Sequence, residues 1–276
     1  MIVDTHVHVV AADQDKYPRK IADWNNEWVA DTTDATMLRL MGEAGIDRTM
    51  LVQAWTAYEY DNSYAADCAI AHPDRFAGVC IIDSTLADAA DTLSYWVRER
   101  GMRGLRLFAI TDSAARSLDD PRTFPVWERA AALAIPICVC TRFRELPRLR
   151  STIERFPDVT VALDHLGLPR LDGGPPYASV QPLFDLARMP NVYLKFSTVN
   201  MDSSRSGSST PRAFFDRLLE HFGSHRMMWG SNFPATHDRS LREQFALARN
   251  ELAFLSDEDQ RWIFGETALS LWPSLR

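Results

Sequence analysis

Two histidines near the amino terminus have a spacing that suits a metal site or a hydrogen-bonding site. Between Ile2 and Val9, apolar and β-branched residues recur at every second position, which is typical of a β-strand. Alternate side chains of a strand point to the same face, so we expect Asp4, His6 and His8 to share one face. Two imidazoles placed in this way can converge on one metal ion or on one substrate oxygen. The alternative is a polar strand edge with no chemistry.

Further polar residues follow later apolar segments of the chain, and each lies where a predicted strand ends. They are Gln53, Trp55, Arg106, Arg142, Asp164, His165, Lys195, Ser197, Ser231 and Asn232. Taken singly, each could be structural, as a salt bridge, a helix cap or a lysine that extends to solvent. Their common placement predicts a ring of cationic and hydrogen-bonding groups around one pocket, provided that the strands are parallel.

The elements that must position these residues alternate regularly along the chain. The predicted strands cover residues 2–9, 49–53, 76–82, 104–108, 135–140, 159–165, 192–196 and 227–230. The predicted helices cover residues 33–44, 62–71, 87–100, 124–134, 146–156, 180–187 and 211–222, with a tail at 240–252 and 257–264. Apolar strands that alternate with helices favour parallel pairing with both faces covered.

Eight such units within 276 residues predict an α/β fold, a (β/α)8 TIM barrel that forms a single domain over residues 1–276. The alternative is a doubly wound open sheet, but no glycine-rich phosphate loop follows the first strand. Active sites of such barrels lie at the carboxyl ends of the strands, where the polar residues above fall.

Two segments do not fit the alternating pattern. Residues 11–33 are aromatic and polar without periodicity, and a loop of this length is either a binding loop or an excursion packed on the surface. We expect Trp24, Trp55 and Tyr58 to contribute to specificity at the rim. Residues 201–210 have no apolar residue after Met201, which predicts a mobile loop on the catalytic face or a disordered surface loop.

The composition excludes some classes of protein. Lys and Arg number 30 against 37 Asp and Glu, a formal net charge of -7, which argues against a general nucleic-acid binder. No apolar run is long enough to span a bilayer and no signal segment precedes the first strand, so we expect a soluble cytoplasmic protein without a membrane partner. The four cysteines lack metal-binding spacing and are expected to be buried thiols. The sequence leaves open whether the chain forms a homo-oligomer.

Three motifs together resemble the amidohydrolase superfamily, in particular the amidohydrolase-related (amidohydrolase 2) branch of lactonase-like, metal-dependent hydrolases. They are Asp4-Thr5-His6-Val7-His8, Asp164-His165-Leu166-Gly167 and Trp229-Gly230-Ser231-Asn232-Phe233-Pro234. The resemblance spans the chain in order and includes the turn 103–106 and the segment 264–268. The branch holds lactonases that act on sugar lactones and on carboxylated lactones or pyrones, and it also holds non-oxidative decarboxylases.

The resemblance implies roles for particular residues. His6 and His8 match histidines that hold a divalent ion or contact the substrate, and His165 matches one that polarises the scissile carbonyl and could join the metal ligands. Arg106 matches an arginine that binds an anionic substituent, and Arg142 and Lys195 are further candidates for that task.

The chain departs from the family pattern at two places. The strand-five histidine or lysine has no equivalent in Val139-Cys140-Thr141-Arg142, so we expect no two-metal centre and at most one divalent cation, zinc, that need not be required. Where most members carry an aspartate, this chain carries Asn232, and an amide cannot accept the proton of an attacking water. The groups that could serve as the base instead are Asp4, Asp164, Asp238 and His165.

These observations favour an enzyme, a hydrolase that opens a small anionic lactone, either a sugar lactone or a carboxylated one, by attack of water on the ring carbonyl. His165, His6 and His8 would stabilise the oxyanion, with Asn232 beside them. Two alternatives remain: a metal-dependent decarboxylase of an aromatic or dienoic acid, and a barrel that binds a small molecule without turnover, with Asn232 as its signature.

Overall fold

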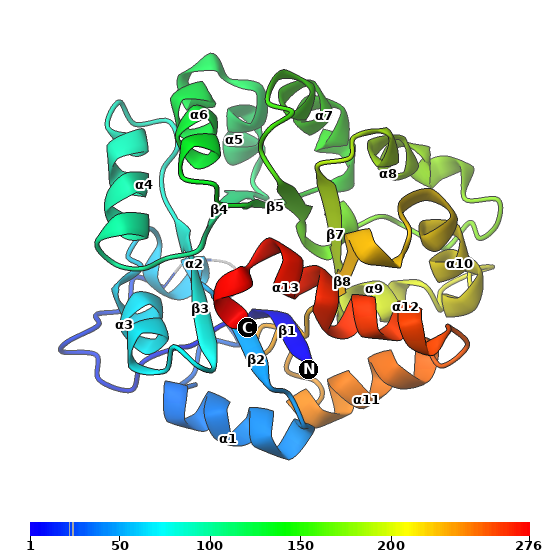
Figure 1. The fold of residues 1–276 in the computed structure, drawn as a ribbon, viewed down its shortest axis with the longest axis horizontal. Helices are drawn as coiled ribbons and strands as arrows, with labels where there is room; N and C mark the ends of the chain where they lie inside the picture. Colours follow the sequence, from blue (N-terminus) through cyan, green and yellow to red (C-terminus); the bar gives the residue numbers. More distant parts are fainter. Residues whose placement is uncertain (22, 24) are drawn as a thin grey trace.

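Eight parallel strands form one sheet in the computed structural model, which describes residues 1–21, 23 and 25–276. Each strand pairs with the next along the chain, in the order β1 to β8. The strands are β1 (Val3–Val7), β2 (Arg48–Val52), β3 (Phe76–Ile81), β4 (Gly104–Ala109), β5 (Ile137–Thr141), β6 (Val161–Leu163), β7 (Val192–Phe196) and β8 (Met227–Trp229). Most of the helices lie outside this ring of strands (Figure 1). The arrangement confirms the predicted (β/α)8 barrel; the domain bounds 1–276 stay a prediction.

The α-helices of the described chain connect the strands and extend the end of the chain. They are α1 (Asp34–Ala44), α2 (Trp55–Tyr58), α3 (Ser63–Ala71), α4 (Ala89–Arg98), α5 (Asp112–Ala115), α6 (Phe124–Ala132), α7 (Leu146–Arg155), α8 (Gln181–Asp185), α9 (Thr198–Ser203), α10 (Pro211–Phe222), α11 (Leu241–Glu251), α12 (Asp257–Arg261) and α13 (Thr267–Leu271). Local sequence sets their ends: Thr33 caps α1 by accepting from the Thr36 N–H, and Gly45 ends it in the left-handed conformation.

The last helix covers one end of the barrel. In Figure 1 α13 lies across the middle of the strands, next to both chain termini. One apolar cluster joins this helix and the residue after it to the strands. It includes Ala268, Leu269 and Trp272 on one side and buried strand residues, among them Val3 and Met50, on the other. Since this cluster includes the first residue of β1, the opposite end, where the strands finish, is the end left for a site.

The barrel is joined between β1 and β8 largely by polar contacts near the ends of these strands. Thr5 Oγ1 donates to the Trp229 carbonyl at 2.7 Å, and the Asn232 N–H donates to the His6 carbonyl at 2.8 Å. A side chain at Gly230 would place its Cβ 2.6 Å from that of His6, so the seam needs a glycine there. The seam therefore fixes His6 directly.

Two local predictions from the sequence are wrong. The sixth strand ends at Leu163, because His165 and Leu166 adopt positive φ angles of 52° and 55° in a turn. Residues 201–210 are not an unanchored loop: α9 runs to Ser203 with Met201 buried, and the buried hydroxyl of Ser209 lies 3.0 Å from that of Tyr177. Serine hydroxyls of this segment hydrogen-bond to neighbouring residues, as those of Ser204 and Ser209 do, and the polar composition did not reveal these contacts.

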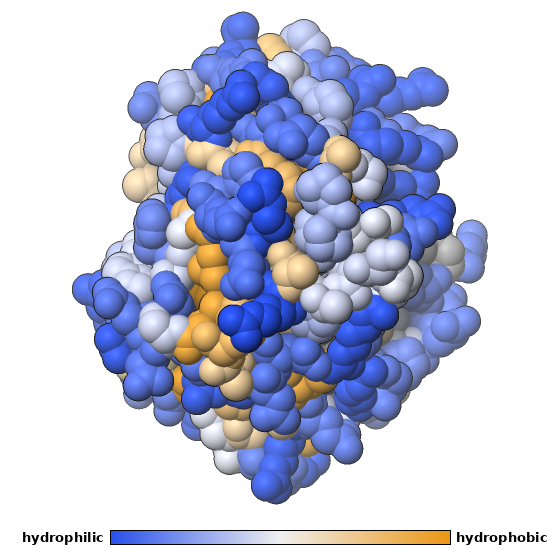
Figure 2. Space-filling model, turned by 90° about the vertical axis from the view of Figure 1, so that its right-hand side faces the viewer, coloured by the Kyte–Doolittle hydropathy of each residue, from blue (hydrophilic) through white to orange (hydrophobic). Residues whose placement is uncertain are grey.

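The side of the molecule drawn in Figure 2 is mainly hydrophilic. Figure 2 shows one side of the molecule, on which a band of hydrophobic residues is exposed among hydrophilic ones. In the part of the chain that the structure describes, no helix combines the length and apolar character that crossing a membrane requires.

Candidate active site

A cavity of about 290 Å³ opens at the carboxyl ends of the strands. It is lined by His8, Asn25, Trp28, Trp55, Thr56, Arg106, Phe108, Ile110, Cys140, His165, Leu168, Val199, Asn232, Ala235 and Thr236. Strands β4 and β5 and the segments that follow β1, β6 and β8 each contribute residues to this lining. A mostly apolar pocket with a few convergent polar groups is what small-molecule sites look like.

Three imidazoles meet beside this cavity. The ring of His6 lies 5.1 Å from that of His8 and 4.7 Å from that of His165, measured between centroids. His8 and His165 line the cavity, whereas His6 lies beneath them and is buried. Burial and the nearby charge of Arg106 lower the pKa of His8 to about 3, and burial foremost lowers the pKa of His165 to about 4. All three rings are thus neutral at pH 7, since the pKa of His6 is also lowered.

Hydrogen bonds fix the two cavity histidines. His8 Nδ1 lies 2.8 Å from the Val52 carbonyl oxygen, which can only accept, so Nδ1 carries the proton and Nε2 is a lone pair. His165 Nδ1 lies 2.9 Å from the hydroxyl of Ser197, which can donate or accept, so His165 Nε2 can act as donor. Asn200 supports this arrangement, because its Nδ2 donates to the His165 carbonyl at 2.8 Å.

A buried carboxylate, Asp164, ties the cationic residues together under the cavity. Arg106 Nε donates to its Oδ2 at 2.9 Å, and Lys195 Nζ lies 3.3 Å from its Oδ1. Burial acts to raise the pKa of Asp164, but the charges of Lys195 and Arg106 and the contact with His6 outweigh burial and hold that pKa well below its usual range. Asp164 is therefore an ionised anchor and a poor base. Two cations face this one carboxylate, and the other buried carboxylate near Lys195 is that of Asp4, behind the site.

The residues predicted from the sequence fall into three groups. His8, His165, Arg106, Asn232 and Trp55 line the cavity together. His6, Lys195 and Ser197 lie directly behind them and are buried.

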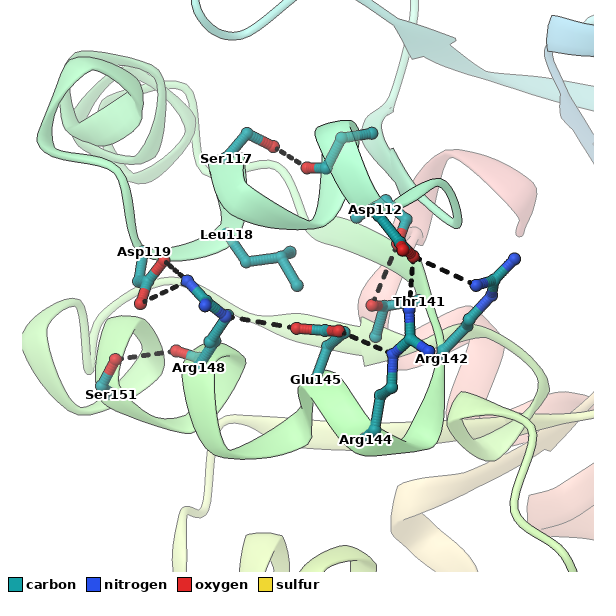
Figure 3. A network of polar contacts seen from close by, with 12 residues as sticks. Asp112, Ser117, Leu118, Asp119, Thr141, Arg142, Arg144, Glu145, Arg148 and Ser151 are labelled. Carbon is teal, nitrogen blue, oxygen red and sulfur yellow. Dashed lines mark hydrogen bonds and ion pairs between the residues drawn. The ribbon is translucent and has the colours of Figure 1, made fainter.

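The others are held elsewhere. Arg142 is 47% exposed and pairs with Asp112 at 3.2 Å, so the structure places it in a network on the rim (Figure 3). Tyr58 is buried, and its hydroxyl accepts from the Ala11 N–H at 2.7 Å, which anchors the 11–33 loop. Asp238 is exposed beside Arg239. Trp24 lies outside the described residues.

Some cavity residues escaped the sequence prediction because they are apolar. Phe108, two residues after Arg106, shares its face of β4, and the Arg106 guanidinium lies 5.0 Å from the centre of its ring. Strand alternation from Arg106 would have found it. Trp28 of the 11–33 loop also lines the cavity, 5.3 Å from the His8 ring, so this loop does contribute to the pocket.

The described residues do not fit a preformed metal site. No group of three or more His, Cys, Asp or Glu side chains is placed to hold one ion in the part of the chain that the structure covers. His6 Nε2 has no hydrogen-bond partner there and could serve as a ligand. However, Asp164 is held by two cations, and position 232 supplies an amide in place of a carboxylate, so the chemistry of the donor set is unfavourable for a divalent cation.

Asp4 lies behind the site and gives a testable dependence of stability on pH. Its Oδ1 accepts from the His6 and Ser231 N–H groups, and burial, against these hydrogen bonds, raises its pKa to about 6. The folded protein then binds more protons than the unfolded chain between about pH 4 and 6, so stability falls as the pH rises through this window. The parent protein should lose on the order of 2 kcal/mol of its free energy of unfolding between pH 4 and pH 7 through Asp4. Asp4→Asn should remove this loss, and urea unfolding at the two pH values measures it.

The control for Asp4→Asn is Asp238→Asn, which removes an exposed carboxylate. It should keep the slope of the parent protein, and an unchanged slope in Asp4→Asn would show that Asp4 does not titrate in this window.

A parallel barrel with a histidine and arginine site at the carboxyl ends of its strands defines a class of enzyme-like (β/α)8 proteins. The chain belongs to the amidohydrolase family, whose model matches residues 3–273.

Individual proteins that resemble this chain share about a fifth to a quarter of its aligned residues. An L-fucono-1,5-lactonase from Burkholderia ambifaria is 25% identical over 198 residues, which are 71% of this chain and 68% of the relative. A 4-sulfomuconolactone hydrolase from Hydrogenophaga intermedia is 25% identical over 235 residues, or 84% of this chain and 74% of that protein. The crystal structure of an amidohydrolase from Burkholderia multivorans with bound zinc has the same fold, with a TM-score of 0.79 at 21% identity over 99% of both chains.

Proposed function

We propose that the protein is a hydrolase that opens a small anionic lactone by attack of water on the ring carbonyl. The observation that carries this proposal is the placement of a buried guanidinium, Arg106, in the same cavity as two neutral imidazoles, His8 and His165. The similarity to an L-fucono-1,5-lactonase and a 4-sulfomuconolactone hydrolase supports it.

His165 would polarise the carbonyl. When the Ser197 hydroxyl donates to His165 Nδ1, the proton of the neutral ring is on Nε2, which can donate to the carbonyl oxygen. This hydrogen bond strengthens as negative charge develops on that oxygen in the tetrahedral intermediate. Ser197 and Asn200 act as positioning residues, since they hold the ring and its backbone.

His8 would take the proton of the attacking water. Its Nε2 is a lone pair in the cavity lining, because Nδ1 is held by the Val52 carbonyl. A free-protein pKa of about 3 makes His8 a weak base; burial is the main cause and the charge of Arg106 is the second. An anionic substrate bound at Arg106 would offset that charge and raise the pKa of His8. Asn232 can orient the water but cannot accept its proton. The ring C–O bond then breaks, and the proton held by His8 passes to the departing alkoxide, giving a hydroxy acid.

Arg106 would hold the anionic substituent. Its Nε is occupied by Asp164, and the described residues give its two Nη groups no oxygen acceptor, so they remain for a carboxylate in the cavity. Lys195, 1% exposed and paired with Asp164, contributes charge without direct contact. The roles given to His165 and His8 need no metal ion. The prediction of at most one divalent cation, zinc, that need not be required stays a proposal, and in this mechanism turnover does not depend on it.

The test of the function is a pH-indicator assay over sugar lactones and carboxylated lactones, with protein stripped by a chelator and again with added zinc. Turnover by the stripped protein is the expected result. Turnover only after zinc is restored would overturn the metal-independent mechanism. Release of CO2 from aromatic acids without lactone opening would replace the proposal by the decarboxylase alternative, and binding without any turnover would replace it by the non-catalytic barrel.

Arg106→Gln separates anionic from neutral substrates. We expect kcat/KM for a carboxylated lactone to fall by about 10²-fold or more, since truncating one partner of a buried charge pair costs about 2–5 kcal/mol. A neutral lactone should lose less, because it has no carboxylate for Arg106 to hold. The measurement is the ratio of the two kcat/KM values in parent and variant. An equal loss for both substrates would show that Arg106 does not bind the substrate's charge.

A further inference from the structure

A second cavity, of about 550 Å³, lies beside the first. The two cavities share Trp55 and Phe108, whose rings stack with centroids 5.1 Å apart and planes 28° apart. The second cavity is formed by residues that follow β3 and β4, so it opens at the same end of the barrel. Its volume is within the range of about 300–1,000 Å³ that is usual for ligand sites. A molecule in the first cavity thus has room to extend past an aromatic pair.

The lining of the second cavity is rich in hydroxyl groups. They belong to Tyr60, Ser84, Thr85, Thr111, Ser113 and Ser117. Ser84 is the informative one, because it is only 7% exposed and its hydroxyl has no hydrogen-bond partner among the described residues. The Ser84 oxygen is not among the fully buried unpaired atoms of the described residues, so it is accessible from the cavity and can bond a ligand there. Ser84 therefore points to a polar ligand in this cavity.

The charged groups in the same lining also suit a neutral ligand that forms hydrogen bonds, because most of them already bond to neighbouring side chains. Asp83 accepts from Thr85, and Asp120 holds Arg122 through both of its carboxylate oxygens. Arg116 lines the cavity and has no carboxylate partner within the described chain, so its donors are available. Hydroxyl, carboxylate and guanidinium groups next to an aromatic face match a sugar ring, whose hydroxyls both donate and accept and whose C–H face packs on aromatic rings.

The outer wall of this cavity is fastened to the barrel. Residues 112–119 form α5 and the turn after it, and an ion-pair network joins them to the segment that follows β5 (Figure 3). Asp112 pairs with Arg142 at 3.2 Å, and Asp119 pairs with Arg148 at 3.0 Å. Leu118 is fully buried, and its carbonyl accepts from Thr152 at 2.6 Å. The wall is thus anchored at several points, as a preformed binding site requires.

We infer that the second cavity is a subsite for a sugar residue attached to the reacting lactone. The inference rests on the proposed function: the lactone ring lies in the first cavity, the glycosyl unit lies in the second, and the linkage passes Trp55. The substrate class is then the lactone of a disaccharide acid or of a similarly glycosylated acid. No group is transferred at the second cavity, which contributes binding only.

The experiment compares a monosaccharide lactone with a disaccharide lactone, gluconolactone against cellobionolactone; both are neutral, so their difference reports the second sugar ring. In the parent protein, kcat/KM should be at least tenfold higher for cellobionolactone. Ser84→Val removes the unpaired hydroxyl, and Arg116→Met removes an exposed guanidinium without a carboxylate partner, so the second variant does not depend on the first one folding. Each should lower kcat/KM for cellobionolactone about tenfold, which is about 1.4 kcal/mol, and leave gluconolactone within about twofold.

Ser151→Val is the matched control, because Ser151 is exposed on α7 and does not line either cavity. It should leave both substrates unchanged. Equal kcat/KM for the two lactones in the parent, or an equal loss for both in the two variants, would overturn the subsite while leaving lactone hydrolysis in place. If neither of these neutral lactones is opened, the hydrolase proposal, which concerns anionic lactones, is not overturned, and binding of free cellobiose decides about the subsite. Calorimetric binding that Arg116→Met weakens would support it, and no binding by the parent would overturn it.

Discussion

Replacing His165 by asparagine should lower kcat/KM for lactone opening by about 10²–10³-fold, the usual cost of removing one oxyanion donor. Asparagine suits the backbone, because residue 165 has a φ of 52° and asparagine tolerates the left-handed region better than most residues. The turn should persist, but the shorter side chain cannot reach the position of His165 Nε2. Most of the loss should fall on kcat, since the hydrogen bond strengthens in the transition state.

The same turn offers a matched control. Leu168 also has a positive φ, 59°, and also lines the cavity. Leu168→Asn therefore introduces the same residue into the same backbone conformation, and we expect less than about a tenfold change. Steady-state kinetics and thermal unfolding should be measured for both variants. If His165→Asn kept more than a third of the parent activity, the carbonyl would have to be polarised by another group.

Asp164→Asn should destabilise the protein by about 3–5 kcal/mol, the cost of leaving buried charge without its partner. Arg106 and Lys195 both face this carboxylate, and both are buried. Burial alone acts to lower the pKa of Lys195, and Asp164 is the main reason that this pKa is raised instead. In the variant we expect this pKa to fall below its value in the unfolded chain. The unfolded chain would then bind more protons, so the stability of the variant should rise with pH.

A double-mutant cycle with Lys195→Met tests this account. Lys195→Met alone leaves Asp164 paired with Arg106 one to one and should cost less than Asp164→Asn. Adding it to Asp164→Asn should recover part of the lost stability, because one unpaired cation is removed. Urea unfolding at pH 6 and pH 9 provides the four free energies. Strict additivity of the two substitutions would mean that the two side chains do not interact.

The fold could be predicted from the sequence because the strands are short apolar runs and the helices between them begin and end at recognisable capping residues. The Thr33 cap and the Gly45 ending of α1 are typical of such signals. The turn at His165 could not be predicted, since the apolar run 159–165 looks like continuous strand and a positive φ outside glycine leaves no pattern. Tertiary contacts alone impose it.

The site could be predicted only in part. Arg106 and His165 reach the cavity because strand ends in a parallel barrel converge. Arg142 also follows a strand, but it pairs with Asp112, which lies in the segment after β4. No spacing rule reveals whether a flexible arginine turns into the cavity or toward a carboxylate on the rim. Phe108 and Leu168 were missed because an apolar residue in a site has the same signature as one in the core.

The two cations paired with Asp164 have a consequence for how a catalytic cycle would end. Opening a lactone ring creates a carboxylate at neutral pH, so the product carries one more negative charge than the substrate. The buried guanidinium and ammonium that favour substrate entry would hold this product more tightly still. Departure of the hydroxy acid would then be slow and would contribute to the steady-state rate of the parent protein beside ring opening. Product inhibition would be strong at low ionic strength and relieved by salt.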